Sequence, residues 1–337
     1  MFKHLAQTVR RVPYTYSASV RAVCTVLGVS GRQYVRGEVL HKNEDGNPNI
    51  FKAACGNESV VFKQESKSIF DLSRRLAEEF EGSRRLRMPV DFNPEDRIVV
   101  YPYFTDTLLD LMRADPEFPP EELKKVLRHV GEAIQEFHAK GWLHLDVKPD
   151  NIFVNWTCDE EGNKTVTDAT LGDFGIAYRP VGATPLRTGI AIGNFMWRSP
   201  EGQTGSGMTK ASDIFSYGLV CIYALGGGHL LLSEDTEELA ELAELGITPR
   251  EYILARHFTY FGSVNEGLLQ QVDSCEHSTL KKASAIAELA AKSQPELRFE
   301  VWGKELGEAG SDMISGMTKP DPTARLTIDQ VLGCSWW

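Results

Sequence analysis

Between residues 34 and 103 the chain alternates short apolar runs with turn residues. Runs at 34–40, 49–55 and 59–64 are separated by Asp-Gly-Asn-Pro at 45–48 and by Gly-Asn at 56–57. Runs of this length, bounded by glycine, proline and asparagine, predict β-strands joined by tight turns. A last apolar run at 98–103 predicts the strand that leaves this region.

One segment inside this region has a helical period instead. Its apolar residues recur three and four positions apart and are Ile69, Leu72, Leu76 and Phe80. Charged residues, among them Arg74 and Glu78, occupy the other faces. The spacing predicts one amphipathic helix among the strands.

From about residue 106 the apolar positions take a helical period. One stripe consists of Leu123, Val126, Leu127, Val130, Ile134 and Phe137. Gly141 follows where a left-handed C-cap is expected. A short strand is predicted at 152–154, and the polar residues at 157–167 predict a hairpin. Together the patterns indicate an α+β chain, strand-rich in its first part and mainly helical in its second.

Composition and charge exclude several classes of protein. The 337 residues are 42% hydrophobic and 25% charged, which is ordinary for a globular protein. The net charge of −11 argues against a dominant nucleic-acid-binding or anionic-membrane surface. The longest apolar stretch, 214–232, contains three glycines at 226–228, so it predicts a buried helix and a turn rather than a membrane span.

Cysteine spacing and the N-terminus bear on the compartment. Six cysteines are scattered without a Cys-x-x-Cys pair, which suits neither a zinc site nor a disulfide framework, and we expect an intracellular, cytoplasmic protein. The first acidic residue is Glu38, and residues 1–33 are expected to form a basic N-terminal extension that packs on or near the first lobe. The alternative is a mitochondrial transit peptide, because such leaders are rich in arginine and poor in acids.

Three short motifs with catalytic chemistry follow one another in the second part of the chain. They are His-Leu-Asp-Val-Lys-Pro-Asp-Asn at 144–151, Asp-Phe-Gly at 173–175 and Ser-Pro-Glu at 199–201. Each is weak evidence alone, but in this order they resemble the catalytic-loop, DFG and APE signatures of the eukaryotic protein kinase family. The resemblance implies a bilobal kinase domain over 34–337, with an N-lobe at about 34–103 and a C-lobe at about 104–337.

The resemblance also implies a role for each polar residue of these motifs. Asp146 would orient the substrate hydroxyl and accept its proton, and Lys148 would offset negative charge on the transferred phosphoryl group. Asn151 and Asp173 would hold magnesium, a hard cation that prefers oxygen ligands.

The nucleotide site is implied by a motif farther upstream. Val-Val-Phe-Lys at 60–63 resembles the family's Val-Ala-Ile-Lys and would place Lys63 on the third strand, against the phosphates of ATP. Its expected partner is a glutamate of the following helix, Glu79, with Glu78 as a one-residue alternative. The walls of the nucleotide site would be formed by Leu40, Ile50, Val61, Tyr103 and Phe153.

Further matches concern the large lobe. Asp213 resembles the residue that braces the backbone of the catalytic loop, while Glu201 and Arg325 resemble a buried ion pair. The chain stops at Trp337, where the family's last helix would end, so we expect no regulatory domain after the kinase region.

The phosphate-covering hairpin departs from the family pattern. His41 and Asn43 stand at the first two glycine positions, and Gly46 is the nearest candidate for the third. Glycine serves there because backbone amides must approach phosphate closely. With Tyr101 as a bulky gatekeeper, the adenine pocket is expected to be narrow.

Two substitutions change the surroundings of the catalytic aspartate. Leu145 replaces the arginine that commonly pairs with a phosphorylated activation loop, so activity is expected not to depend on that phosphorylation. Asn194 stands where serine/threonine kinases usually have a threonine, and its side-chain amide is expected to take over that hydrogen bonding.

The sequence favours an ATP- and magnesium-dependent kinase that phosphorylates serine and threonine hydroxyls of protein substrates. Lys148, in place of the arginine-containing pattern of tyrosine kinases, favours these acceptors. The alternative is a pseudokinase or nucleotide-binding scaffold with little or no turnover, suggested by the degenerate glycine-rich loop. A small-molecule phosphotransferase is a third interpretation, disfavoured by the Ser-Pro-Glu motif and Arg325. No nucleic acid partner is expected, and no motif specifies an oligomeric state.

Overall fold

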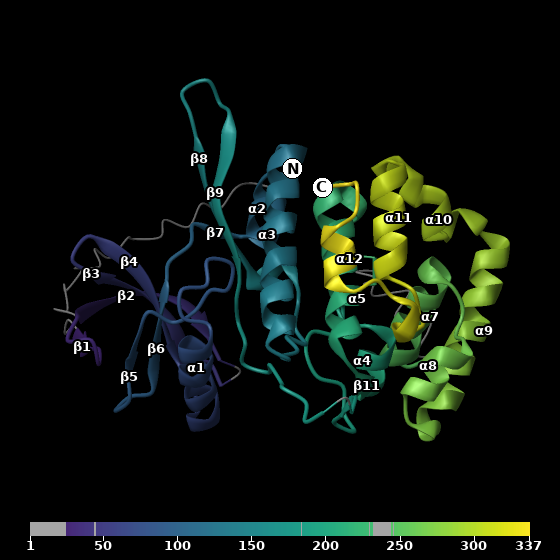
Figure 1. Cartoon of the computed structure of the whole chain (residues 1–337), viewed down its shortest axis with the longest axis horizontal. Helices are drawn as coiled ribbons and strands as arrows, with labels where there is room; N and C mark the ends of the chain where they lie inside the picture. Colours follow the sequence, from purple (N-terminus) through teal and green to yellow (C-terminus); the bar gives the residue numbers. More distant parts are fainter. Residues whose placement is uncertain (1–24, 44, 183, 229, 232–243, 245) are drawn as a thin grey trace, which may run out of the picture.

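The computed structural model describes residues 25–337 except 44, 183, 229, 232–243 and 245. This part of the chain forms a β-sheet lobe beside a larger helical lobe (Figure 1). The predicted fold class is therefore confirmed: an antiparallel sheet with one helix, followed by a mainly helical part. Residues 1–24, most of the predicted basic extension, lie outside the described residues. Each described helix is too short or too polar to cross a bilayer.

The N-lobe contains an antiparallel sheet and helix α1 (Lys67–Glu79). In sheet order the described strands are β1 (Thr25–Leu27), β2 (Gln33–Lys42), β3 (Pro48–Cys55), β4 (Glu58–Gln64), β6 (Ile98–Pro102) and β5 (Asp91–Asn93). Strand β1 pairs with β2, so residues 25–33 belong to this lobe rather than to an extension. Strand β5, for which the sequence pattern gave no signal, forms the edge next to β6.

Alternation along the strands decides which side chains meet helix α1. Val61, Val99 and Tyr101 point to one face of the sheet and pack with Phe70 of the helix. The helix begins after Ser66, whose hydroxyl accepts the backbone N–H of Ile69. The predicted amphipathic helix is thus confirmed, and it lies beside the face of the sheet that carries Lys63.

Helices and short strands make up the C-lobe. The helices are α2 (Leu108–Ala114), α3 (Pro120–Ala139), α4 (Pro200–Thr204), α5 (Lys210–Ile222), α7 (Pro249–Phe261), α8 (Glu266–Gln271), α9 (His277–Ser293), α10 (Phe299–Trp302), α11 (Glu308–Met317) and α12 (Ile328–Leu332). The strands are β7 (Asp106–Thr107), β8 (Ile152–Cys158), β9 (Lys164–Leu171), β10 (Leu186–Arg187) and β11 (Ser206–Met208). Short 3₁₀ turns include Pro149–Asn151, and a π-helical turn follows α5 at Tyr223–Gly227.

Helix α3 carries the predicted apolar stripe into the core of this lobe. All six stripe residues are buried, and Phe137 at its end contacts the rings of Phe80 and Phe174. The apolar stretch that begins at 214 is the buried helix α5 followed by the π turn, as predicted. The predicted hairpin is formed by β8 and β9, which project from the lobe beside α2 and α3 (Figure 1).

A buried ion pair ties α4 to the segment before α12, as predicted. Arg325 donates to both carboxylate oxygens of Glu201 at 2.7 and 2.9 Å, and both side chains are fully buried. The guanidinium also donates to the backbone carbonyls of Lys319, Ala211 and Pro320. A buried charge that is paired and fully hydrogen-bonded specifies one arrangement of the segments it joins.

Replacing Arg325 by methionine should lower the free energy of unfolding by about 3–5 kcal/mol, because Glu201 is left charged and buried. Urea denaturation at neutral pH measures the loss. The exposed pair Lys67–Asp71 supplies a control, since Asp71→Asn should cost less than about 1 kcal/mol. Equal losses in the two variants would contradict this role for the buried pair.

Acid should weaken the same pair. Burial raises the pKa of Glu201, but the charge and hydrogen bonds of Arg325, with the Ser212 hydroxyl, hold that pKa below its ordinary value. A carboxyl group whose pKa is lower in the folded state stabilises the fold at pH values above its ordinary pKa. This stabilisation is lost as the pH falls through the folded-state pKa. The wild-type protein should therefore lose stability below about pH 4.5. The contribution of Glu201 to that loss should be absent from Arg325→Met in acid-denaturation profiles.

Candidate active site

A cleft of about 740 Å³ lies between the two lobes. Nine of the predicted site residues line it: Leu40, Ile50, Val61, Lys63, Tyr103, Lys148, Asn151, Phe153 and Asp173. They come from β2, β3, β4 and β8, from the connection after β6, and from the segments before β8 and after β9. Folding therefore brings both halves of the motif set to one cavity, and this cleft is the candidate active site.

The carboxylate of Asp146 stands at the centre of a polar cluster beside this cleft. One oxygen, Oδ2, lies 3.2 Å from Nζ of Lys148 and accepts from Nδ2 of Asn151 at 3.0 Å. The other, Oδ1, accepts the backbone N–H of Asn194 at 2.8 Å. The prediction for Asn194 was wrong in its atom, because its side-chain oxygen accepts the N–H of Met196 instead.

The catalytic loop is held from below by Asp213 of helix α5. Its carboxylate accepts the backbone N–H groups of His144 and Leu145, both at 2.8 Å, which confirms the predicted brace. Leu145 has φ +65, a left-handed conformation that costs a residue with a side chain about 1–2 kcal/mol. The two hydrogen bonds that the loop donates to Asp213 offset this strain and fix the backbone next to Asp146.

Leu145, which replaces the arginine common in the family, has apolar surroundings. Its side chain is buried in an apolar cluster with Leu143 and Met208, against which Leu186 and Ile192 pack. The segment at 186–192 is thus held against the catalytic loop by apolar contact at this point.

His144 links the catalytic loop to the Asp-Phe-Gly segment. Its Nε2 lies 3.0 Å from the carbonyl oxygen of Gly172, and its Nδ1 accepts the N–H of Asp146. The imidazole ring lies edge-on to Phe174, with ring centroids 5.1 Å apart. Asp173 follows Gly172 with φ +60, which turns its carboxylate toward the cleft and Lys63.

Lys63 pairs with two carboxylates, and neither belongs to helix α1. Its Nζ donates to Oδ1 of Asp173 at 2.8 Å and lies 3.1 Å from Oε1 of Glu65. Burial lowers the pKa of Lys63, but the two negative charges outweigh burial and raise it above its ordinary value. Burial raises the pKa of Asp173, while Lys63 brings it below its ordinary value.

The predicted pair of Lys63 with Glu79 is not formed. Glu79 is the last residue of α1, where its carboxylate accepts from Arg179 at 2.9 Å and from the indole N–H of Trp142 at 3.2 Å. Glu78 is exposed on the surface of the same helix. The position of a glutamate along the chain does not give the rotation of the helix about its axis, so the sequence alone could not show which way Glu79 points.

The cleft contains a cation that the sequence pattern did not reveal, beside Phe153 and Tyr101. Arg87 is buried, and its guanidinium lies 4.0 Å from the ring centroid of Phe153 and donates to the carbonyl oxygen of Pro102. Burial lowers the pKa of Arg87 to about 10. A Cβ at Gly172 would meet the Phe153 ring at 2.9 Å and Cβ of Arg87 at 3.1 Å, so glycine there makes room for both.

The hairpin over the phosphate end closes on itself with side-chain hydrogen bonds. Oδ1 of Asn43 accepts the N–H of Asn47, and Gly46 has φ +78 within the turn. His41 and Asn49 line the cleft and bond to each other at 3.0 Å. Gly46 thus provides the positive φ of the turn, while the side chains of His41 and Asn49 line the cleft.

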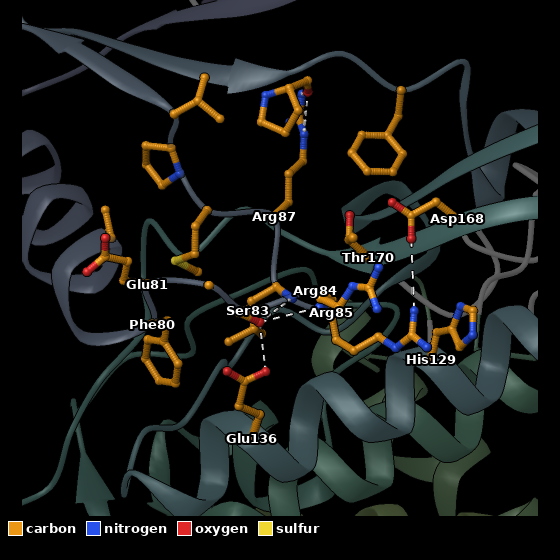
Figure 2. Close-up of a pocket in the computed structure, with 18 of the residues that line it drawn as sticks. Phe80, Glu81, Ser83, Arg84, Arg85, Arg87, His129, Glu136, Asp168 and Thr170 are labelled. Carbon is orange, nitrogen blue, oxygen red and sulfur yellow. Dashed lines mark hydrogen bonds and ion pairs between the residues drawn. The ribbon is translucent and has the colours of Figure 1, made fainter. Parts of the chain in front are cut away.

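A second cavity, of about 1210 Å³, lies behind the connection between the lobes (Figure 2). Its charged lining includes Arg84, Arg85, Arg87, Glu81, Glu136 and Asp168. Arg85 pairs with Glu132 of α3, and Ser83 donates to Glu136 at 2.7 Å. The lining balances positive with negative side chains and holds none of the predicted catalytic or metal residues, so the smaller cleft is the better candidate.

The donor atoms at Asn151 and Asp173 fit a magnesium ion. Asn151 uses Nδ2 to donate to Asp146, which leaves its amide oxygen for a cation. Asp173 uses Oδ1 for Lys63, which leaves Oδ2. Both residues line the cleft, and an amide oxygen with a carboxylate is the kind of ligand that magnesium prefers.

Similarity to known proteins covers most of the chain. A family model described as "Protein kinase domain" matches residues 86–337. Similar proteins include the serine/threonine-protein kinase pkn2 of Myxococcus xanthus, 29% identical over 45% of this chain, and PrkC of Bacillus subtilis, 32% identical over 46%. The serine/threonine-protein kinase drp72 of Corynebacterium efficiens is 25% identical over 64% of this chain. The chain spans 19%, 24% and 35% of the lengths of pkn2, PrkC and drp72.

Gly193 allows the segment before Ser-Pro-Glu to approach the catalytic loop. It has φ +82, and a Cβ there would collide with the carbonyl oxygen of Leu145. Gly193→Ala should therefore lower the free energy of unfolding by at least about 2 kcal/mol more than Gly189→Ala. Gly189 is the matched control, because it has φ +71 but nothing within 4 Å of an added Cβ. Denaturant titration compares the two variants, and equal losses would mean that only the backbone angle matters.

Proposed function

Since this chain belongs to the protein kinase domain family, we propose that it transfers the γ-phosphoryl group of ATP to serine and threonine hydroxyls of protein substrates. The observation that carries the proposal is the cluster of Asp146, Lys148 and Asn151 beside a cleft also lined by Lys63 and Asp173. A base, two cations and two oxygen ligands around one cavity are what phosphoryl transfer requires.

In the proposed reaction the substrate hydroxyl lies against Asp146. Its oxygen bonds to the γ-phosphorus, the bond from that phosphorus to the β–γ bridging oxygen breaks, and ADP leaves. The hydroxyl proton passes to the Asp146 carboxylate, which Asn151 and the N–H of Asn194 keep oriented.

The surrounding residues supply charge and position. Lys148 offsets the negative charge that spreads over the phosphoryl oxygens, and Lys63 holds the phosphates of the bound nucleotide. Magnesium held by Asn151 and Asp173 would neutralise phosphate charge. The apolar ring of Phe153 and the side chain of Val61 would enclose the adenine.

The second candidate function is a nucleotide-binding scaffold with little turnover. The hairpin over the cleft places His41 and Asn49 where backbone amides would approach phosphate, and Arg87 occupies the adenine end. These features favour weak nucleotide binding but leave the catalytic cluster complete. Full retention of Asp146, Lys148, Asn151 and Asp173 favours the enzyme.

Phosphate incorporation from radiolabelled ATP with magnesium into a serine- and threonine-containing protein tests the enzyme. Asp146→Asn removes the base and Lys63→Met the phosphate contact, and each should reduce the rate by at least about 100-fold. Asp159→Asn, in the exposed hairpin, should match the wild type. Wild-type incorporation no greater than that of the two site variants would refute the enzyme, and thermal stabilisation by ATP without turnover would support the scaffold.

Activity should also be independent of phosphorylation between Asp-Phe-Gly and Ser-Pro-Glu. Leu145 is buried in an apolar cluster and offers no cation to a phosphate, and the Thr188 hydroxyl already donates to the carbonyl of Ile190. Phosphatase-treated protein and the variants Thr184→Ala and Thr188→Ala should keep turnover within about twofold of the untreated protein. A several-fold rise on phosphorylation would contradict this expectation.

A further inference from the structure

We propose that Glu65, and not a glutamate of helix α1, is the positioning residue for Lys63. The inference rests on the proposed function for its consequence, since Lys63 is the residue assigned to the phosphates of ATP. The Lys63–Glu65 pair replaces the pair between Lys63 and Glu79 of helix α1 that the sequence predicted. The position of Lys63 would then be set within the strand itself and by Asp173.

The contact follows from strand geometry. Lys63 lies near the end of β4, and Glu65 follows two residues later, so the two side chains leave the same face. Their charged atoms are 3.1 Å apart, and the side chain of Glu65 is only 8% exposed. Burial raises the pKa of Glu65 above its ordinary value, although the charge of Lys63 opposes this. A carboxylate this buried has little water to replace Lys63, so loss of the lysine contact would leave it without a partner.

The backbone around Glu65 is held on both sides. Its N–H donates to the carbonyl oxygen of Arg97 at 3.0 Å, and its own carbonyl accepts from Nε of Arg97 at 3.2 Å. Arg97 has φ +52, so the turn that makes these contacts is itself a specific conformation. The carboxylate is thus presented to Lys63 from a clamped segment that does not belong to helix α1.

The acids of helix α1 are elsewhere. Asp71 is exposed and pairs with Lys67, and Glu78 is also exposed. Glu79 forms an ion pair with Arg179. The first turns of the helix present Phe70 to the sheet, where it packs with Val61, Val99 and Tyr101. Glu79 lies nine residues beyond Phe70, which is about 13 Å farther along the helix axis.

Helix α1 has its own tie to the large lobe. The carboxylate of Glu79 accepts from Arg179, which follows the Asp-Phe-Gly segment, and its backbone carbonyl accepts from Nζ of Lys140. Lys63 and α1 are therefore held by separate carboxylates. A shift of the helix would leave the Lys63–Glu65 contact intact, since neither residue is part of it.

The rate at which the Lys63 amine is acylated tests its contact with Glu65 and does not require catalysis. The titratable groups facing its ammonium are Asp173, Glu65 and Tyr101. Glu65→Gln removes one of the two carboxylates that hold the Lys63 amine. The amine should then be freer to react, so its acylation by a small uncharged ester near neutral pH should accelerate several-fold. Mass spectrometry of the Lys63 peptide measures the rate, with exposed Lys67 as the internal standard.

Glu79→Gln is the matched control, because it removes the same charge from the residue that sequence reasoning assigned to Lys63. It should leave the acylation rate of Lys63 unchanged. Glu65→Asp, which keeps the charge but shortens the side chain, should fall between wild type and Glu65→Gln and serves if the glutamine variant does not fold. An unchanged Lys63 rate in both Glu65 variants, or an equal acceleration in Glu79→Gln, would overturn the proposal.

Binding of ATP with magnesium, measured by calorimetry, tests the consequence for the site. Glu65→Gln should weaken the affinity roughly tenfold, the factor of one charge-assisted hydrogen bond, while Glu79→Gln should not change it. A larger loss in Glu79→Gln would mean that α1 turns toward Lys63 when nucleotide binds, and would refute Glu65 as the positioning residue. Absence of ATP binding in the wild type would instead refute the proposed function, and the acylation rates would still judge the Lys63–Glu65 contact.

Discussion

The candidate site depends on one buried carboxylate, that of Asp213. It lies on helix α5 within the large lobe and accepts two consecutive backbone N–H groups of the catalytic loop. Burial would raise its pKa, but hydrogen bonds and the nearby imidazoles of His138 and His144 hold that pKa below its ordinary value, so the group stays charged. A charged acceptor in a dry interior is what keeps Leu145 in a left-handed conformation and Asp146 aimed toward the cleft.

In the large lobe, hydrogen bonds and ion pairs of 2.8 to 3.2 Å hold the groups next to Asp146. Asp146 is surrounded by Lys148, Asn151 and the backbone of Asn194, and Gly193 admits that backbone because it has no side chain to collide with the loop. The buried pair of Glu201 and Arg325 secures the segment that follows. This side of the candidate site is thus anchored to the buried charges of Asp213, Glu201 and Arg325.

The nucleotide side of the cleft is organised differently. Lys63 is held by Asp173 and by Glu65 of its own strand segment, while helix α1 is tied separately through Glu79 to Arg179. Arg87 and Phe153 lie against each other in the cleft, where Gly172 makes space for them. The hairpin that covers the phosphate end lacks the expected glycines and closes through Asn43 instead. Departures from the family pattern thus occur at this hairpin and at the partner of Lys63, whereas Leu145 and Asn194 depart from it on the side of Asp146.

The amino-acid sequence by itself determined the fold class, the order of most elements and the motifs that the large lobe brings to the candidate site. Motifs such as the one around Asp146 are local, so the residues that act together are close in the chain and their spacing is readable. Only the tertiary structure decided which carboxylate meets Lys63, because the rotation of α1 and the face on which Glu65 emerges depend on packing against the sheet. It also decided that Asn194 acts through its backbone and that Arg87 enters the cleft. Asn194 and Arg87 are distant in sequence from the residues that they meet. Glu65 is only two residues from Lys63, but its burial beside that lysine is set by packing in the fold rather than by a local pattern.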